Sequence, residues 1–252
     1  MASDFRLLDG KTAVITGCNR GIGKAVLETF AAHGATVFAC VRKENNEFSE
    51  FIGRLSTMHA VQIIPVYFDA AKMDELKSAV KLIVASGQPV HILVNNAATG
   101  YNALFQMSTF DKLKDVFDVN FFAPFIFTQY LVKLMVRQKS GSIINISSTA
   151  GIDGNEGKSV YGASKAALIC MTNVIATELG GFGIRANSIA PGMTDTDMME
   201  WIPKDVIMKK IQSGGHKSVG KSSHIADTAL FLASDLSANI SGQVIRVDGG
   251  LK

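Results

Sequence analysis

Residues 12–23 read TAVITGCNRGIG, a short β-branched run followed by a turn with glycines at positions 17, 21 and 23. The run predicts a buried strand, and we expect a helix from about Gly23 to His33. Glycines between the two let the backbone turn tightly and approach a pyrophosphate at the positive end of the helix. The spacing is G-x-x-x-G-x-G, and the alternative is a plain strand-to-helix turn. The turn is expected to hold a dinucleotide through Gly17, Asn19, Arg20, Gly21, Ile22 and Gly23.

The alternation of apolar runs and helical stretches continues along the chain. Further strands are expected at residues 35–41, 62–68, 91–95, 142–146, 184–189 and 243–247. Helices are expected near residues 43–57, 73–85, 118–137 and 161–178. Strands that are apolar throughout and separated by helices indicate a parallel sheet covered on both faces. We therefore expect one domain over residues 1–252, an α/β Rossmann-type doubly wound sheet of about seven strands, with Pro65 on an edge strand.

Composition and charge exclude several classes of protein. The chain has 252 residues, is 47% hydrophobic and 19% charged, and carries a formal net charge of +3. This small, dispersed charge argues against nucleic acid as a partner, and no run approaches the roughly 20 apolar residues of a membrane span. Cys18, Cys40 and Cys170 lie far apart, and no apolar segment follows the first six residues. We expect a cytoplasmic protein with reduced thiols and, because its five histidines are scattered, no metal.

The end of the second expected strand bears on the choice of dinucleotide. An acidic residue there would hold the ribose 2′-hydroxyl of NAD and repel the 2′-phosphate of NADP. This chain has Arg42 and Lys43 at that place and no acid before Glu44. Arg42, helped by Arg20 in the glycine turn, could pair with the extra phosphate, although both could also be solvated surface charges. We expect NADP(H) to be preferred over NAD(H).

The segment 159–165, SVYGASK, carries the candidate chemistry. Tyr161 and Lys165 are four residues apart, so on a helix they lie on one face about one turn apart. Upstream, Ser147 and Ser148 end an apolar strand. A tyrosine has a pKa of about 10, and a nearby ammonium group lowers that pKa and makes the phenol a usable acid and base. Tyr161 is therefore the candidate proton carrier.

Together these motifs resemble the short-chain dehydrogenases/reductases, in particular the FabG-like branch of 3-oxoacyl-(acyl-carrier-protein) reductases, from about Leu8 to the C-terminus. Several motifs stand in the family's order, which is more specific than any one of them alone. They are Thr16-Gly17…Gly21-Ile22-Gly23, Asp69, Asn95-Asn96-Ala97-Ala98, Asn120, Ser148, Tyr161…Lys165 and Pro191-Gly192. One position departs from the family's usual pattern, because Ala98 stands where glycine is common.

The resemblance implies hydride transfer between nicotinamide and a ketone or secondary alcohol. Tyr161 would carry the proton, and Lys165 would stabilise the phenolate and bind the nicotinamide ribose. Ser148, chosen over Ser147 by the family spacing to Tyr161, would donate a hydrogen bond to the carbonyl oxygen. Asn120 would hold a water linked to Lys165, or would simply satisfy a helix backbone group.

Further cofactor-binding residues follow from the resemblance alone. Asp69 would contact the adenine, and Asn95 and Ala97 would line the floor of the cofactor site. Pro191, Gly192 and Thr194 would fix the nicotinamide face and its carboxamide.

The substrate is expected under a lid at about residues 193–223. That segment contains Met193, Met198, Met199, Trp201 and Met208. They would form an apolar, adaptable wall or simply pack the lid onto the body. Gly214-Gly215 reads as a hinge or as a plain turn.

The leading expectation for the reaction is reduction of a 3-oxoacyl thioester carried by an acidic acyl carrier protein. Against it, Phe182 stands where carrier-dependent relatives often have an arginine. The alternatives are a free small ketone, sugar or secondary alcohol as substrate, and a non-catalytic NADP-binding sensor or scaffold. The family resemblance and the small-residue surface of the helix near residues 161–178 predict a homotetramer.

Overall fold

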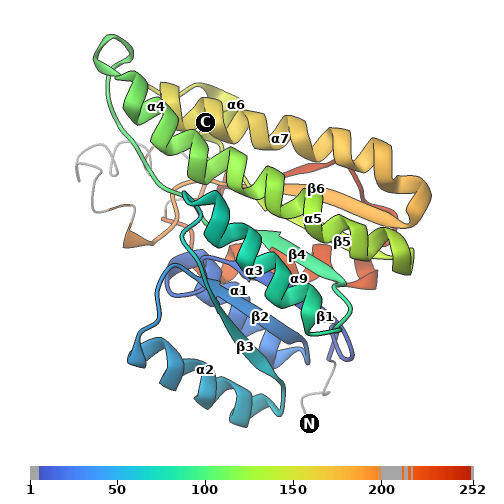
Figure 1. Cartoon of the computed structure of the whole chain (residues 1–252). Helices are drawn as coiled ribbons and strands as arrows, with labels where there is room; N and C mark the ends of the chain where they lie inside the picture. Colours follow the sequence, from blue (N-terminus) through green and yellow to red (C-terminus); the bar gives the residue numbers. More distant parts are fainter. Residues whose placement is uncertain (1–5, 198, 200–211, 213–214, 217, 251–252) are drawn as a thin grey trace.

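A seven-stranded parallel sheet forms the centre of the molecule (Figure 1). The computed structural model describes residues 6–197, 199, 212, 215–216 and 218–250. The strand order is β3-β2-β1-β4-β5-β6-β7 and every pairing is parallel. The strands are β1 (Thr12–Thr16), β2 (Thr36–Val41), β3 (Ile63–Tyr67), β4 (Ile92–Asn95), β5 (Gly141–Ile146), β6 (Ile184–Pro191) and β7 (Val244–Val247). The predicted doubly wound sheet is confirmed.

Burial along the strands explains why they could be found from sequence. Every residue of β1, β4, β5 and all but one of β6 is buried, because helices cover both faces of the sheet. β3 pairs only with β2 and is less buried, so Pro65 lies on an edge strand as predicted.

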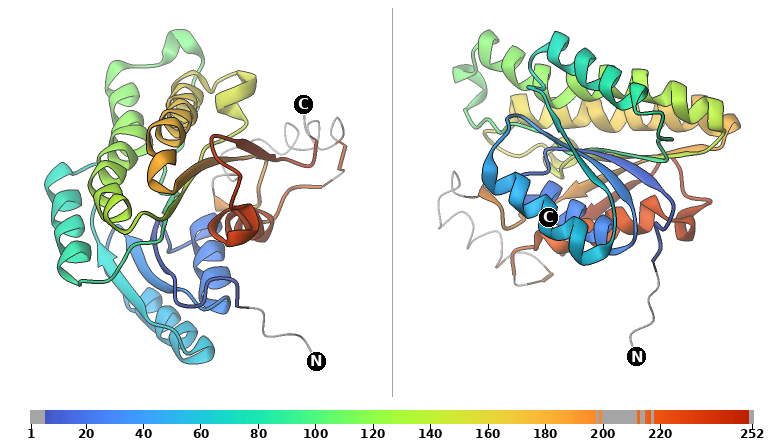
Figure 2. Two further views of the ribbon diagram at one scale, coloured as in Figure 1. Left: turned by 90° about the vertical axis from the view of Figure 1, so that its right-hand side faces the viewer. Right: turned by 60° about the horizontal axis from the view of Figure 1, so that its bottom comes forward.

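Two layers of helices enclose the sheet (Figure 2). Buried side chains of α1, α2 and α9 form one core with the sheet. Buried side chains of α3 and α5, with partly buried side chains of α7 packed against them, form a second core on the other face. The longer helices are α1 (Gly21–Ala32), α2 (Asn46–His59), α3 (Met73–Ala85), α4 (Phe110–Phe117), α5 (Ala123–Gln138), α7 (Ser159–Leu179) and α9 (Ser222–Ala233). Short helical turns are η1 (Phe105–Met107), η2 (Asp118–Phe122), α6 (Ala150–Asp153), η3 (Gly180–Phe182) and η5 (Asp235–Ser237).

The helix expected at residues 118–137 differs from the structure. There α4 runs into η2, a π-helical turn, and η2 runs into α5, so that one continuous rod extends over residues 110–138. This rod is also the one stretch of the described chain long and apolar enough to span a membrane by length and composition. Phe127, Leu131 and Met135 on α5 are buried against the sheet, so the rod is a core helix.

Candidate active site

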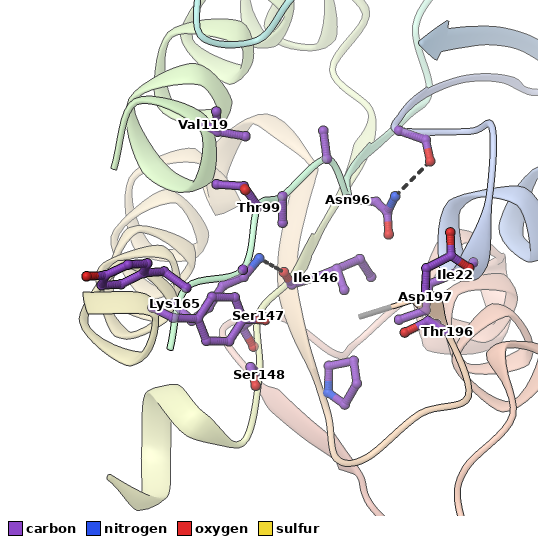
Figure 3. Close-up of a pocket in the computed structure, with 18 of the residues that line it drawn as sticks. Ile22, Asn96, Thr99, Val119, Ile146, Ser147, Ser148, Lys165, Thr196 and Asp197 are labelled. Carbon is purple, nitrogen blue, oxygen red and sulfur yellow. Dashed lines mark hydrogen bonds between the residues drawn. The ribbon is translucent and has the colours of Figure 1, made fainter. Parts of the chain in front are cut away.

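A cleft of about 1330 Å³ opens at the carboxyl ends of the strands. The strand order reverses between β1 and β4, and in such sheets ligands bind at this switch point. Figure 3 shows Ile22, Thr196 and Asp197 on one side of the cleft and Thr99, Val119 and Lys165 on the other. Both the glycine turn and the Tyr161 segment line this cleft.

The glycine turn is shaped to let a ligand approach its backbone. Gly17 has a φ of 75°, which favours glycine, and its amide donates to the Cys40 carbonyl at 2.8 Å. A Cβ on Gly23 would collide with the Gly17 carbonyl and the Asn96 side chain. No side chain caps the first turn of α1, and that turn contains no acid. Its amides and positive dipole therefore suit a pyrophosphate, and the residues present fit a dinucleotide.

Asn96 anchors this turn to the end of β4. Its side-chain amide donates to the carbonyls of Thr16 at 2.9 Å and Gly17 at 3.2 Å. Its backbone amide and that of Ala97 both donate to the Thr16 hydroxyl at 3.0 Å. From the sequence alone Asn96 is only one member of a motif, with no role of its own.

Asn95, expected on the cofactor floor, does not line the cleft. Its side chain is buried and donates to Thr128 Oγ1 at 2.9 Å and to Asn145 Oδ1 at 2.8 Å. Successive side chains of a strand point to opposite faces, so the residue that reaches the turn is Asn96. The expectation for Asn95 is therefore corrected: it joins β4 to α5 and β5.

The two arginines expected at the 2′-phosphate lie in different settings. Arg42 is exposed at the end of β2, where it lines the cleft. Arg20 forms an ion pair with Asp197 across the cleft, with 2.8 Å between Nη1 and Oδ2. The Arg20 side chain therefore already has an acidic partner from the segment after β6, which sequence reasoning did not foresee.

The other expected cofactor residues lie along the same cleft. Asp69, Ala97, Pro191, Gly192 and Thr194 all line it. Asp69 Oδ1 accepts from the Ala71 amide at 3.0 Å. Gly192 is held to β7 by its amide, which donates to the Val247 carbonyl at 3.0 Å. A Cβ on Gly192 would lie 2.6 Å from that of Asp248.

Tyr161 and Lys165 lie one turn apart on α7, with 5.8 Å between Lys165 Nζ and the centre of the Tyr161 ring. Lys165 is 2% exposed, and its Nζ donates to the Ile146 carbonyl at 2.8 Å (Figure 3). Ser148 is hydrogen-bonded to the Tyr161 phenol. Its Oγ also accepts from the Ala150 amide at 3.1 Å. The structure thus brings a phenol, a hydroxyl and an ammonium group together beside the cleft.

The structure separates Ser148 from its neighbour. Ser147 is buried, and its hydroxyl donates to the Ile189 carbonyl at 2.9 Å. It also accepts from the Ser188 hydroxyl at 2.7 Å. Ser147 therefore joins β5 to β6, whereas Ser148 is the serine at the phenol.

Burial controls the ionisation of the pair. Burial raises the pKa of Tyr161, and the hydrogen bond to Ser148, which lowers that pKa, offsets only part of the rise. Burial also lowers the pKa of Lys165 to about 8, because the ammonium group has lost its hydration. The expected lowering of the Tyr161 pKa is therefore wrong for the protein without cofactor. The phenol is protonated at neutral pH and is ready to act as an acid.

Asn120 lies in the π-helical turn and is 1% exposed. Its Oδ1 accepts from the Thr99 amide at 2.8 Å, and its Nδ2 donates to the Thr99 carbonyl at 3.0 Å. Nδ2 also donates to Ser164 Oγ at 3.1 Å. Asn120 does not line the cleft itself, and it ties the loop after β4 to α7. These contacts satisfy the backbone of Thr99, which lies in a loop and not in a helix as the alternative expected; the water linked to Lys165 stays a prediction.

An ion-pair cluster that sequence reasoning missed secures the segment after Ser148. Ala150–Asp153 form α6, and a Cβ on Gly151 would lie 2.8 Å from the Ala166 amide of α7. Arg246 on β7 binds both oxygens of Asp153, at 2.7 and 2.8 Å, and also binds Asp248 at 2.7 Å. The pairing joins residues 93 positions apart, so no local pattern could reveal it.

Parts of the expected lid fall outside the described residues, namely Met198, Trp201, Met208 and Gly214. Met193 and Met199 line the cleft. Within the described chain no group of three or more His, Cys, Asp and Glu side chains is placed to hold a metal ion.

The fold and the cleft define a dinucleotide-binding α/β protein with a tyrosine-centred site. The family model described as short chain dehydrogenase matches residues 11–206. The chain is 38% identical to the 3-oxoacyl-[acyl-carrier-protein] reductase FabG of Thermotoga maritima, over 97% of this chain and 98% of that protein.

Two solved structures are similar over almost their full length. A 7α-hydroxysteroid dehydrogenase complexed with NADH and 7-oxo glycochenodeoxycholic acid has a TM-score of 0.91 and 32% identity, covering 100% of this chain and 98% of that one. A 3-oxoacyl-[acyl-carrier protein] reductase with bound NAD from Brucella melitensis has a TM-score of 0.89 and 29% identity, covering 98% and 93%. The chain belongs to the short-chain dehydrogenase family, and it is a FabG-like oxidoreductase of the EC 1.1.1 type.

Proposed function

We propose that this protein reduces the ketone of a 3-oxoacyl thioester to an alcohol, using NADPH. The observation that carries the proposal is the half-buried Tyr161 phenol, hydrogen-bonded to Ser148 beside a cleft that fits a dinucleotide. The similarity to 3-oxoacyl-[acyl-carrier-protein] reductases supports the choice of substrate.

Each residue of the cluster has a defined task in this reaction. Reduced nicotinamide, when bound, supplies the hydride that goes to the carbonyl carbon. Tyr161 gives its phenolic proton to the carbonyl oxygen, so that one hydride and one proton convert the ketone into the alcohol. Ser148 hydrogen-bonds that oxygen while its negative charge develops. The charge of Lys165 stabilises the phenolate until a proton from solvent restores the phenol.

Replacing Tyr161 with phenylalanine tests the assignment. Tyr161→Phe should lower the turnover rate with acetoacetyl thioester at least about a thousandfold, because the proton donor is lost. The dissociation constant for NADPH should change little. The turnover rate is measured from the loss of NADPH absorbance, and the dissociation constant from NADPH fluorescence. A variant with near-normal turnover would disprove the role of Tyr161.

We also propose that NADP(H) is preferred over NAD(H). Arg42 lines the cleft at the end of β2, where it could pair with the 2′-phosphate of bound NADP(H). Arg42→Ala should weaken NADPH binding about tenfold or more and leave NADH binding within about twofold. The matched control is Lys43→Ala, since Lys43 is also exposed and follows Arg42 directly. Tighter binding of NADH than NADPH by the unaltered protein would refute the preference.

The second candidate reaction acts on a free ketone, sugar or secondary alcohol. Phe182 is exposed in η3 and provides no charge for an acidic carrier protein. Turnover of an acetoacetyl-carrier thioester is therefore compared with that of a panel of free ketones. Turnover of the free ketones alone would favour the second candidate. Tight NADPH binding with no turnover of any carbonyl would favour a sensor or scaffold.

We further propose a cytoplasmic homotetramer. Val174 on α7 and Phe122 and Phe125 near the start of α5 are exposed apolar side chains on helices that could pack against another copy. Sedimentation equilibrium tests this, and a monomer at micromolar concentration would refute it.

A further inference from the structure

A buried hydroxyl on α7 is hydrogen-bonded to the backbone at Tyr161. Ser164 is 0% exposed, and its Oγ donates to the Tyr161 backbone carbonyl at 2.7 Å. The same oxygen accepts from Asn120 Nδ2 at 3.1 Å. A serine hydroxyl has a single hydrogen to donate, so Ser164 can only accept from Asn120. The hydrogen bonds therefore run in one direction, from the Asn120 amide through Ser164 to Tyr161.

Asn120 extends this series of hydrogen bonds to the wall of the cleft. Its Nδ2 also donates to the Thr99 carbonyl at 3.0 Å, so both hydrogens of the amide group are used. Its Oδ1 accepts from the Thr99 amide at 2.8 Å. Thr99 lines the cleft, whereas Asn120 and Ser164 do not (Figure 3). Direct hydrogen bonds thus join a residue of the cleft wall to the turn of α7 that carries the phenol.

Helix stability does not explain Ser164. It lies inside α7, where serine is a weaker helix former than alanine, and a hydroxyl bonded to its own helix destabilises that helix slightly. Its partner Asn120 lies in the π-helical turn Asp118–Phe122, and such turns are rare and frequent at functional sites. The position is better explained by the contact between the two helices.

A second contact fixes the same turn of α7 to α6. A Cβ on Gly162 would lie 2.6 Å from the Ala150 carbonyl oxygen, so the two backbones touch. The Ala150 amide in turn orients the Ser148 hydroxyl, which is hydrogen-bonded to the phenol. The contact with α6 therefore places Tyr161 against Ser148, and Ser164 places it against the loop after β4.

We propose that Ser164 is a positioning residue for the proton transfer, because it holds the Tyr161 turn in place against the Thr99 loop. The inference rests on the proposed carbonyl reduction at Tyr161 and adds a residue outside the Ser148, Tyr161 and Lys165 cluster. Ser164 contacts neither substrate nor cofactor. Proton transfer needs the phenol within hydrogen-bond distance of the carbonyl oxygen, so a small displacement of Tyr161 slows turnover much more than it weakens binding.

The test removes this hydroxyl and compares the effect with that of a matched hydroxyl elsewhere. Ser164→Ala deletes only the Oγ atom and leaves one hydrogen of the buried Asn120 amide without its acceptor. Ser164→Cys keeps the shape of the side chain but weakens both hydrogen bonds, since a thiol is a poor donor and acceptor.

Thr172→Val is the matched control. Thr172 lies about two turns further along α7 and is also 0% exposed. Its Oγ1 donates to the Leu168 carbonyl at 2.8 Å and accepts from Asn145 Nδ2 at 2.8 Å, which is the same pattern of bonds as at Ser164. Thr172 does not line the cleft, and valine keeps its shape while removing the hydroxyl. The control therefore reports what the loss of a buried hydroxyl on α7 does by itself.

Ser164→Ala should lower kcat with acetoacetyl N-acetylcysteamine about tenfold or more. The KM for this thioester and the dissociation constant for NADPH should stay within about threefold. The isotope effect on kcat, with NADPH deuterated at the transferred position, should rise because the chemical step becomes slower. Ser164→Cys should have an intermediate kcat. Thr172→Val should lower the urea midpoint, as Ser164→Ala does, while its kcat stays within about twofold of the unaltered protein.

Several results would overturn the role of Ser164 and leave the carbonyl reduction standing. They are an unchanged kcat in Ser164→Ala, an equal loss of kcat in Thr172→Val, and a loss that appears only in KM or in NADPH binding. If Ser164→Ala does not fold, Ser164→Cys decides, and an unchanged kcat in that variant would overturn the role as well.

Hydrogen exchange of the Thr99 amide supplies a measurement that needs no turnover. This amide donates to Asn120, so its exchange reports how firmly Asn120 holds the loop. Exchange should be about tenfold faster in Ser164→Ala than in the unaltered protein and unchanged in Thr172→Val. An unaltered protein that reduces no thioester would refute the proposed reaction. Faster exchange would then still support Ser164 as the residue that positions this loop, and unchanged exchange would overturn it.

Discussion

Replacing Arg246 with methionine should both destabilise the protein and displace Ser148. The change removes two hydrogen bonds to Asp153, at 2.7 and 2.8 Å, and one to Asp248, at 2.7 Å. Charged hydrogen bonds contribute about 1.5–3 kcal/mol each when buried and much less when exposed. The side chains of Arg246 and Asp153 are 34% and 33% exposed, whereas that of Asp248 is only 8% exposed and would lose its cation.

We therefore expect a loss of about 3 kcal/mol, most of it from the Asp248 carboxylate left without Arg246. For a chain of this size that corresponds to a fall in Tm of roughly 6–12 °C. Turnover should fall about tenfold, because α6 supplies the Ala150 amide that orients the Ser148 hydroxyl. The dissociation constant for NADPH should stay within about twofold, since the glycine turn lies elsewhere in the cleft.

A double-mutant cycle separates the Asp153 contribution. Urea unfolding is measured for Arg246→Met, for Asp153→Asn and for the two combined, with kcat and KM determined on the same samples. Because the two side chains bind each other directly, the combined loss should be smaller than the sum of the single losses by about 1 kcal/mol. Two results would refute the reasoning. One is that the losses of unfolding free energy in the two single variants add up in the double variant, and the other is that the KM for NADPH rises about tenfold while kcat is unchanged.

Four further substitutions follow from the site. Gly23→Ala should raise the dissociation constant for NADPH at least about tenfold, measured by fluorescence, because its Cβ would collide with the Gly17 carbonyl; unchanged binding would contradict this. Lys165→Met should lose turnover yet gain about 1–3 kcal/mol in urea unfolding at pH 7, since burial holds the pKa of Lys165 at about 8, below its unfolded value. That gain in stability should shrink as the pH rises from 8 toward about 10.4, because Lys165 of the folded protein is then already a neutral amine and no charge is buried. A gain in stability that does not depend on pH would contradict this prediction. Ser148→Ala should lower kcat with little loss of stability, whereas Ser147→Ala should do the reverse, because only Ser147 joins β5 to β6.

Most of the sheet could be predicted from the sequence because parallel strands covered on both faces are apolar at every position. The expected strand at residues 12–16 coincides with β1, and the expected helix at residues 73–85 coincides with α3. Pro65 was a reliable sign of an edge strand, since proline cannot donate to a second neighbour. The glycine turn was found because its glycines lie between a recognisable strand and helix.

The parts that could not be predicted depend on contacts between distant residues or on the exact end of an element. α4 was missed because its eight residues give only about two turns of periodic sequence before Asp118, where the predicted helix begins. Asn95 and Asn96 are chemically identical, and only the register of β4 decides which of them reaches the glycine turn. Arg20 and Asp197 are 177 positions apart, so their pairing appears only in the folded chain.

The π-helical turn at Asp118–Phe122 makes this rod sensitive to its length. An α-helix turns by about 100° per residue, so deleting one residue between this turn and Phe127 would rotate Asn120 by that angle relative to the buried face of α5. Phe127 and Leu131 could stay on the sheet only if Asn120 turned away from Thr99. A substitution within the turn changes one contact. A deletion or insertion of one residue after the turn instead rotates every residue before it relative to the buried face of α5. Natural variants of this protein should therefore tolerate changes of sequence in this segment far better than changes of length.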